Sequence, residues 1–190
     1  MGRRRPTHTV WMMESVEYKL KIGDSCPGFD LPGTDGKMYK LEDFHADILA
    51  VFFTCNHCPY AIAVEPRINE VAKNFTNISV VGINSNNSSE YPEDSFDAMV
   101  KRVKEKDLHF LYLHDESQLV AKDFGGQCTP HFFIFDKERK LRYQGRFDDN
   151  WQDPGNVAKE DFKDAILAIQ EDKEIPEPVT PAMGCSIKWK

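Results

Sequence analysis

The stretch that decides the fold is ILAVFFTCNHC, residues 48–58, in which six apolar residues lead almost directly into two cysteines. The apolar run is rich in β-branched and aromatic side chains, which is typical of a central strand covered on both faces. Residues 59–75 carry apolar side chains at helical spacing, with Pro66 inside the pattern. We therefore expect the cysteines to lie at the turn from a buried strand into a helix.

The two cysteines, Cys55 and Cys58, are predicted to form a redox-active pair. At a strand-to-helix turn the first sulfur should lie over the helix N-terminus, where free backbone N–H groups and the helix dipole stabilise a thiolate. A spacing of three residues lets the sulfurs form a disulfide without a large backbone movement. We predict that Cys55 is the exposed attacking thiol and Cys58 the resolving thiol, and that His57 favours the reduced form.

The rest of the chain alternates predicted strands with predicted helices. Apolar runs predict strands at 48–54, 78–84, 110–115, 131–136 and 140–147, and helical periodicity predicts helices at 59–75, 96–106, 117–124 and 158–170. A turn sequence, PGTDGK, lies between two short strands within residues 29–41. This order predicts an α/β fold with a central sheet, parallel in its first part, and helices on both faces.

Length and charge limit the classes of partner. The chain has 190 residues, with 24 Lys and Arg against 31 Asp and Glu, so its net charge is -7. An acidic chain has no electrostatic reason to bind nucleic acid or an anionic membrane surface. No apolar run approaches the roughly 20 residues that span a bilayer. We expect a flexible N-terminal arm at 1–17, one domain at 18–172 and a Pro-rich C-terminal tail at 173–190.

Five cysteines, at positions 26, 55, 58, 128 and 185, form an odd and sparse set for a chain of this length. Such a set argues against a framework of structural disulfides and favours a reducing compartment. Because no secretory signal pattern precedes the domain, the expected location is the cytoplasm. We expect Cys26 to be a passive buried residue.

The dipeptide Thr129-Pro130 opens the predicted strand at 131–136, a position compatible with a cis peptide bond. A C-x-x-C at a strand–helix junction together with this Thr-Pro resembles the thioredoxin superfamily, in which a cis-proline loop faces the cysteine pair. The resemblance implies a thioredoxin fold with a central mixed sheet, and places Pro130 at the cis-proline position.

A closer resemblance rests on four segments: FDLPGTDGKMYKLEDF (29–44), FFTCNHCPYA (52–61), GGQCTPHFFIFD (125–136) and MGCSIKWK (183–190). Together they are similar to the AhpC/TSA, peroxiredoxin-like family, in the branch that carries C-x-x-C. This resemblance implies an N-terminal β-hairpin extension and a redox pair formed by Cys55 and Cys58.

The function predicted from these features is a thiol:disulfide oxidoreductase without a bound cofactor, which acts on transient dithiol or disulfide protein partners or on small thiols. The first alternative is a thiol-dependent peroxidase. Two departures from the peroxiredoxin pattern count against it. The Thr expected three residues before the peroxidatic Cys is replaced by Phe52 for Cys55, and by Cys55 itself for Cys58. The Arg expected before the strand at 131–136 is missing, with Arg146 the nearest basic candidate.

The second alternative is a metal-binding or metallochaperone module that uses the C-x-x-C with one of His57, Cys128 or His131. Zinc or copper(I) would suit thiolates, but no second C-x-x-C completes a tetrahedral site. Cys128 is expected near the pair, as a second resolving thiol, a metal ligand or a small buried residue. Cys185 is expected to be passive unless a mobile tail brings it to Cys55. His131 is expected to face solvent at a strand edge.

Overall fold

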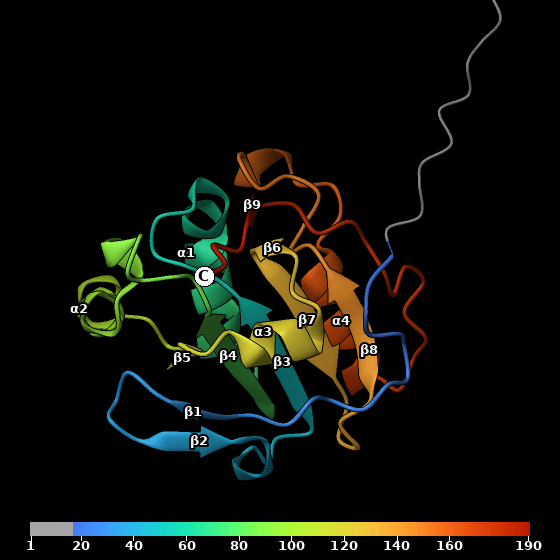
Figure 1. The fold of residues 1–190 in the computed structure, drawn as a ribbon. Helices are drawn as coiled ribbons and strands as arrows, with labels where there is room; N and C mark the ends of the chain where they lie inside the picture. The colour runs from blue at the N-terminus through green and yellow to red at the C-terminus, as the bar shows by residue number, and fades with distance from the viewer. Residues whose placement is uncertain (1–16) are drawn as a thin grey trace, which may run out of the picture.

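The chain folds around a five-stranded sheet of order β5-β4-β3-β7-β8, as the computed structural model of residues 17–190 shows (Figure 1). The strands are β3 (Ile48–Phe53), β4 (Ile78–Asn84), β5 (Leu111–His114), β7 (His131–Phe135) and β8 (Leu141–Gly145). β3, β4 and β5 are parallel neighbours, whereas β7 is antiparallel to both β3 and β8. The predicted α/β thioredoxin fold with a mixed sheet is confirmed.

β3 is the centre of the core because both of its faces are apolar and covered. Its six residues are all buried. Ile48, Ala50 and Phe52 pack on one face, and the alternate side chains of the strand pack on the other face. Each fully buried aliphatic or aromatic side chain contributes about 1.5–3 kcal/mol. The apolar run of residues 48–53 therefore requires a layer of structure on each side of the sheet.

Helices and the N-terminal hairpin supply these two layers. The helices are α1 (Pro59–Asn74), α2 (Phe96–Lys106), α3 (Leu119–Phe124) and α4 (Asp161–Gln170). Side chains of α1, α2 and α4 pack against the Phe52 face. The other face is covered by α3 and by the predicted hairpin of β1 (Asp30–Pro32) and β2 (Met38–Lys40), which lies below the sheet in Figure 1.

The C-terminal residues, expected to form a Pro-rich tail at 173–190, return across the domain. Val179 pairs with Gln144 beside β8, and β9 (Cys185–Ser186) pairs antiparallel with β6 (Cys128–Thr129). Ile187 is buried in the same cluster as Phe53. The arm expected at 1–17 lies outside the described residues except for its last position. Within residues 17–190, no helix is long and apolar enough to cross a membrane.

Candidate active site

Cys55 and Cys58 lie in the turn between β3 and α1, as predicted. Cys58 is the N-cap residue and Pro59 the first helical residue. Proline suits this position because its φ angle is already helical and it has no N–H group to leave unpaired. Cys58 is therefore the residue at the helix N-terminus, and Cys55, three residues earlier, lies in one small cluster with Ala61 of the first helical turn.

Both thiols of the pair are buried. Cys55 is 2% exposed and Cys58 0% exposed. They form a small cluster with Ala61, against which Tyr60 and Cys185 also pack. The prediction of an exposed Cys55 is wrong, because neighbouring side chains and the C-terminal segment cover the turn. Sequence periodicity does not indicate such a cover.

The loop between β6 and β7 faces the pair through Thr129. The Thr129-Pro130 peptide bond is cis, which confirms the compatibility seen in the sequence. The Thr129 hydroxyl lies 3.4 Å from Cys55 Sγ, and the Cys58 thiol, when protonated, donates to the Thr129 carbonyl oxygen at 3.0 Å. β7 pairs with β3 so that His131 is opposite Phe53, and this register brings Thr129 to the end of β3.

The electrostatics of the pair favour a first thiolate on Cys58. A hydrogen bond from Cys55 lowers the pKa of Cys58 to about 4, with further support from Thr129 and from the N–H groups of Ala61 and Cys185. The same bond, followed by burial and by the charge of Asp94, raises the pKa of Cys55. The two thiols thus lose their first proton as a unit and share one negative charge.

Asp94 is the residue of the site that the sequence did not reveal. It lies at the end of the 3₁₀ helix Pro92–Asp94 and is fully buried. The N-cap of α2 is the next residue, Ser95, whose hydroxyl accepts the Ala98 N–H. No periodicity in the segment NSNNSSEYPED, residues 84–94, distinguishes an inward carboxylate from a solvated one.

The Asp94 carboxylate holds the turn that carries the cysteines. It accepts the Asn56 backbone N–H at 2.6 Å and the side-chain amides of Asn84 and Asn86 at 3.2 and 2.8 Å. His57 Nδ1 lies 2.7 Å from Asp94 Oδ2, and the imidazole ring stacks on Tyr91. His57 is therefore positioned between the thiols and a buried carboxylate, beside the pair as expected.

Cys185 joins the pair, whereas Cys128 lies behind it. Cys185 is opposite Thr129 in the β6–β9 pairing and packs against Cys55 and Cys58. Cys128 is buried beneath Pro130, and burial raises the pKa of its thiol to about 12. Burial likewise raises the pKa of Cys26 to about 12, in a cluster on the hairpin side of the sheet.

His131 and Arg146 do not reach the pair as reactive groups. His131 is completely buried between Tyr18 and Phe133, and burial lowers the pKa of its imidazole to about 3. The expectation that it is solvated is wrong because β7 is an interior strand, paired on both sides. Arg146 is held by Asp161, to which its Nε donates at 2.7 Å.

A metal could approach one group of donor atoms within residues 17–190. Atoms of Cys55, His57 and Asp94 lie within 4.8 Å of one another. Both oxygens of Asp94 already accept hydrogen bonds, from Asn56 and Asn84 on one oxygen and from Asn86 on the other. The group is therefore accounted for by contacts within the protein, and neither Cys128 nor His131 joins it.

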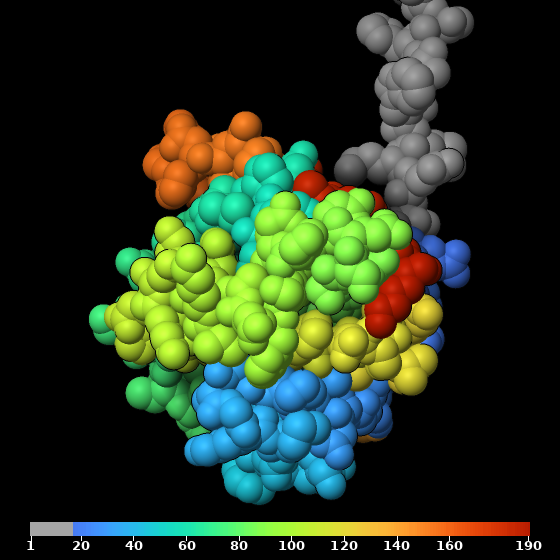
Figure 2. Space-filling model, turned by 60° about the vertical axis from the view of Figure 1, so that its left-hand side comes forward, coloured from blue at the N-terminus to red at the C-terminus, as the bar shows by residue number. Residues whose placement is uncertain are grey.

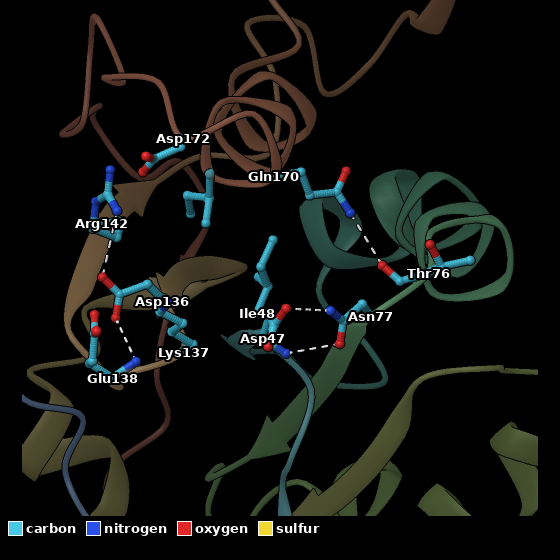
Figure 3. Close-up of a pocket in the computed structure, with 11 residues that line it drawn as sticks. Asp47, Ile48, Thr76, Asn77, Asp136, Lys137, Glu138, Arg142, Gln170 and Asp172 are labelled. Carbon is cyan, nitrogen blue, oxygen red and sulfur yellow. Dashed lines mark hydrogen bonds and ion pairs between the residues drawn. The ribbon is translucent and has the colours of Figure 1, made fainter.

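A cleft lined by Asp47, Asn77 and Asp136, among others, contains neither cysteine of the pair (Figure 3). Its volume is about 590 Å³, and Asp47 and Ile48, at the start of β3, help to line it. Cys55 follows the other end of the same strand. A smaller cavity has a volume of about 20 Å³ and is lined by Pro130, Trp151 and Met183, among others. Pro130 follows Thr129, which contacts both cysteines.

The AhpC/TSA family model matches residues 22–144. The thiol-disulfide oxidoreductase ResA of Bacillus cereus is 26% identical over 130 residues, which are 67% of this chain and 70% of ResA. Peroxiredoxin Bcp of Escherichia coli is 32% identical over 112 residues, which are 56% of this chain and 65% of Bcp. The metal-binding alternative finds no support in these matches.

Among solved structures, an uncharacterized conserved protein from Geobacillus kaustophilus is similar over nearly the whole chain. It is 39% identical with a TM-score of 0.84, and the alignment covers 94% of this chain and 97% of that one. This likeness includes the C-terminal part of the chain, which lies beyond the residues matched by the family model.

Proposed function

The chain belongs to the AhpC/TSA family of thioredoxin-fold oxidoreductases, and on this premise we propose that it exchanges disulfides through a redox pair formed by Cys55 and Cys58. The observation that carries the proposal is the contact of both sulfurs with one residue, Thr129, on the cis-proline loop. A metal module would not need this loop, whereas disulfide exchange uses it to present backbone beside the reacting sulfurs.

In the reaction, one thiolate of the pair attacks a substrate disulfide and forms a mixed disulfide, and one substrate thiolate leaves. The second cysteine then attacks the mixed disulfide, and the second substrate thiolate leaves. The Cys55–Cys58 disulfide forms, two electrons pass to the substrate, and the two protons of the pair go to the leaving thiolates. Electrons return from another dithiol, so no bound cofactor is required.

Cys58 is the N-cap residue of α1, and its pKa is lowered, chiefly by its neighbour Cys55, so it can carry the negative charge of the pair. The thiolate is the nucleophile in disulfide exchange. Because the two sulfurs lose their first proton as a unit, we assign the attacking thiolate to the Cys55–Cys58 pair, and the other cysteine of the pair resolves the mixed disulfide.

Dithiothreitol-driven reduction of insulin tests the proposal. Cys58→Ser and the double variant Cys55→Ser/Cys185→Ser should each reduce the rate to background, because neither variant keeps two neighbouring thiols of this cluster that can form and then resolve a mixed disulfide. Cys26→Ser is the matched control, since Cys26 is buried away from the pair and should leave the rate unchanged. Full activity in Cys58→Ser or in Cys55→Ser/Cys185→Ser would rule out the pair mechanism.

Equilibrium titration of the pair against glutathione buffers gives the direction of electron flow. A reduction potential near about -270 mV would make the protein a reductase, and one above about -200 mV an oxidant or isomerase. If the Cys55–Cys58 disulfide does not form at any ratio of reduced to oxidised glutathione, the redox assignment itself is refuted.

Peroxide reduction is the second candidate, because Bcp is a peroxiredoxin and Cys58 carries a lowered pKa. Oxidation of the reduced protein by one equivalent of hydrogen peroxide distinguishes peroxide reduction from disulfide exchange. Thiolate loss that is much faster with peroxide than with a small disulfide would favour the peroxidase. The structure weighs against it, since Arg146 is engaged by Asp161, and the position three residues before the cysteine is Phe52 for Cys55 and Cys55 for Cys58, neither of which offers a hydroxyl.

The partners we propose are transient dithiol or disulfide proteins and small thiols, in the cytoplasm. The acidic surface charge supports protein or small-thiol partners over nucleic acid or anionic membranes. Trapping with the Cys55→Ser and Cys58→Ser variants in a cell extract, followed by release with dithiothreitol, would identify proteins held as mixed disulfides.

A further inference from the structure

The edge of the cis-proline loop is occupied by the protein's own C-terminal strand. β9 pairs with β6, so that Cys185 lies opposite Thr129 and Ser186 opposite Cys128. Thr129 is the residue that also contacts both sulfurs of the pair. A free strand edge beside a redox site is the kind of surface that an extended peptide can bind by strand addition. Here a cysteine of the same chain is presented there.

The approach of this segment depends on a glycine. A Cβ placed on Gly184 would lie 2.0 Å from the Thr129 carbonyl oxygen and 3.0 Å from Pro130 N, so no larger residue fits without displacing the strand. On its other side, the segment is held by backbone contacts of Lys188, whose carbonyl accepts the Asn87 N–H at 2.7 Å and the Gln118 side-chain amide at 2.9 Å.

These contacts seat the last residues on the surface above the buried pair. In Figure 2 the C-terminal residues, in red, lie between the yellow-green segment and the yellow segment that contains α3. The Lys188 N–H also donates to Asn86, a member of the Asp94 network. The C-terminal strand is therefore tied to the same polar network that positions the Cys55–Cys58 turn.

Cys185 is the accessible thiol of the group. Cys55 and Cys58 are almost completely buried, whereas Cys185 is partly exposed. Cys185 packs against the cluster that contains both sulfurs, and it lies opposite Thr129, which contacts both of them. We propose that Cys185 is a third redox thiol, which accepts the disulfide from the buried pair as Cys58–Cys185 and passes electrons between the pair and an external dithiol. This inference rests on the proposed redox function.

The exchange is balanced. In the oxidised protein, the Cys185 thiolate attacks Cys58 Sγ, the Cys58–Cys185 bond forms, the Cys55–Cys58 bond breaks, and Cys55 takes up the proton that Cys185 released. One thiolate of an external dithiol then attacks the exposed Cys185 sulfur, the Cys58–Cys185 bond breaks and Cys58 leaves as a thiolate. The second thiol of the external dithiol attacks the mixed disulfide and releases Cys185, so that the external dithiol becomes a disulfide and its two protons and two electrons pass to the protein. Burial and the Cys58 thiolate raise the pKa of Cys185 in the reduced protein. Oxidation of Cys58 removes that charge, so Cys185 ionises more easily when its attack is needed.

Trypsin separates the relevant thiols, which makes the inference directly testable. Cys55 and Cys58 fall in one peptide, 41–67, and Cys185 falls in another, 174–188. A Cys55–Cys58 disulfide leaves peptide 41–67 uncrosslinked and lighter by two hydrogens, whereas Cys58–Cys185 joins 41–67 to 174–188. The experiment oxidises the full chain with oxidised glutathione, blocks free thiols at acidic pH and maps the peptides by mass.

In Cys55→Ser, the crosslink of 41–67 to 174–188 should be the main product, and it should persist in Cys55→Ser/Cys128→Ser and vanish in Cys55→Ser/Cys185→Ser. Absence of the crosslink in Cys55→Ser, with the Cys55–Cys58 disulfide intact in the wild type, would overturn the third-thiol role and leave the proposed function standing. Absence of both disulfides in the wild type would refute the proposed function as well.

Two further variants distinguish a Cys185 that exchanges disulfides with the pair from a Cys185 that only shields the pair from solvent. Dithiothreitol should reduce the Cys55–Cys58 disulfide of the Cys185→Ser variant at least about tenfold more slowly than that of the wild type. The variant lacks the intramolecular attack of Cys185 on Cys58, and an intramolecular thiol acts at a high effective concentration. Gly184→Val should displace β9, weaken the crosslink and speed alkylation of Cys58. Gly28→Val is the control, because no atom lies within 4 Å of its added Cβ. Faster reduction in Cys185→Ser would show that Cys185 merely shields the pair.

Discussion

At the scale of single residues, the site depends on Asp94 as much as on the cysteines. Its buried carboxylate accepts the Asn56 backbone N–H and lies beside His57, so it fixes the two residues between the thiols. Thr129 fixes the thiols themselves from the opposite side. The turn between β3 and α1 is thus held from both sides by buried polar groups.

Asp94→Asn should lower the free energy of unfolding by about 1–3 kcal/mol. An amide cannot accept from Asn56, Asn84 and Asn86 as a carboxylate does, so at least one buried donor loses its partner. Urea denaturation of the reduced protein measures the change. Glu93→Gln is the control, because the neighbouring Glu93 is exposed and its substitution should shift stability by less than about 0.5 kcal/mol. Equal effects in the two variants would contradict this role of Asp94.

Cys58 should make the stability of the reduced protein depend on pH. Its folded-state pKa of about 4 is below that of a free thiol, about 8.5, so the unfolded chain holds the proton that the folded chain has lost. The stabilising contribution is complete above about pH 8.5 and is lost as pH falls toward 4. Reduced wild type should therefore gain stability over reduced Cys58→Ser as pH rises through this window.

The oxidised protein is the control for this pH dependence. A disulfide has no thiol to titrate, so oxidised wild type should lack the extra rise in stability between these pH values. Unfolding at several pH values, with and without dithiothreitol, measures both forms. A reduced wild type whose pH dependence matches that of Cys58→Ser would show that Cys58 is not the group that ionises first.

At the scale of elements, the start of α1 and the path of the C-terminal segment decide the site. Pro59 begins the helix and so places Cys58, not Cys55, at its N-terminus. Residues 178–187 follow β8 and then β6, and three glycines make the close approaches possible: Gly126, Gly145 and Gly184. The accessible surface of the pair is thus set by a segment more than a hundred residues away in sequence.

Gly145→Ala should destabilise the docked C-terminal segment. Gly145 has a φ of +142°, which other residues avoid, and an added Cβ would lie 2.3 Å from the Thr180 carbonyl oxygen. The expected loss is at least about 2 kcal/mol in the free energy of unfolding, from backbone strain and overlap together. Gly28→Ala, with a free Cβ position and no positive φ, should change stability far less. Similar free energies of unfolding for the two variants would mean that the segment at Thr180 can move to accommodate the added Cβ without loss of stability.

The sequence predicted elements well where local periodicity determines them. The strand at 78–84 and the helix at 96–106 were predicted with the bounds observed in β4 and α2, because each has an apolar pattern and a clear terminus. The hairpin of β7 and β8 was also predicted. The β6–β9 pairing was not, because two-residue strands joined across the molecule leave no periodic signal.

At the scale of the whole molecule, the sheet separates two chemical environments. Its long β3 and β4 strands carry apolar clusters along both faces, while the ends of these strands lead into the cysteines and the Asp94 network. The pattern of the strands predicted the core. It could not predict that Asn84, Ser85 and Asn86 are buried, because their burial depends on Asp94 and on Lys188, which are distant in sequence.

β3 contributes side chains to the core and leads into the site. A core substitution in β3 therefore tests whether core packing affects the redox chemistry of the cysteine pair. Phe52 is buried two residues before the turn, and its ring contacts Phe110 and Phe132 with centroids 5.1 and 5.3 Å away. Gly82 leaves room for it, since a Cβ there would lie 2.9 Å from the Phe52 ring. Phe52→Ala should therefore open a cavity and cost about 3–5 kcal/mol.

The Phe52 side chain points away from the Cys55–Cys58 cluster, into the layer of α1, α2 and α4. At a temperature where Phe52→Ala is still folded, the reduction potential of its pair should match that of the wild type, because Phe52 packs in a different cluster from the two cysteines. Met38→Ala, at an exposed position of the hairpin, is the control for stability and should stay within about 0.5 kcal/mol. A changed potential in folded Phe52→Ala would mean that core packing, and not the polar contacts of the turn, sets the redox chemistry.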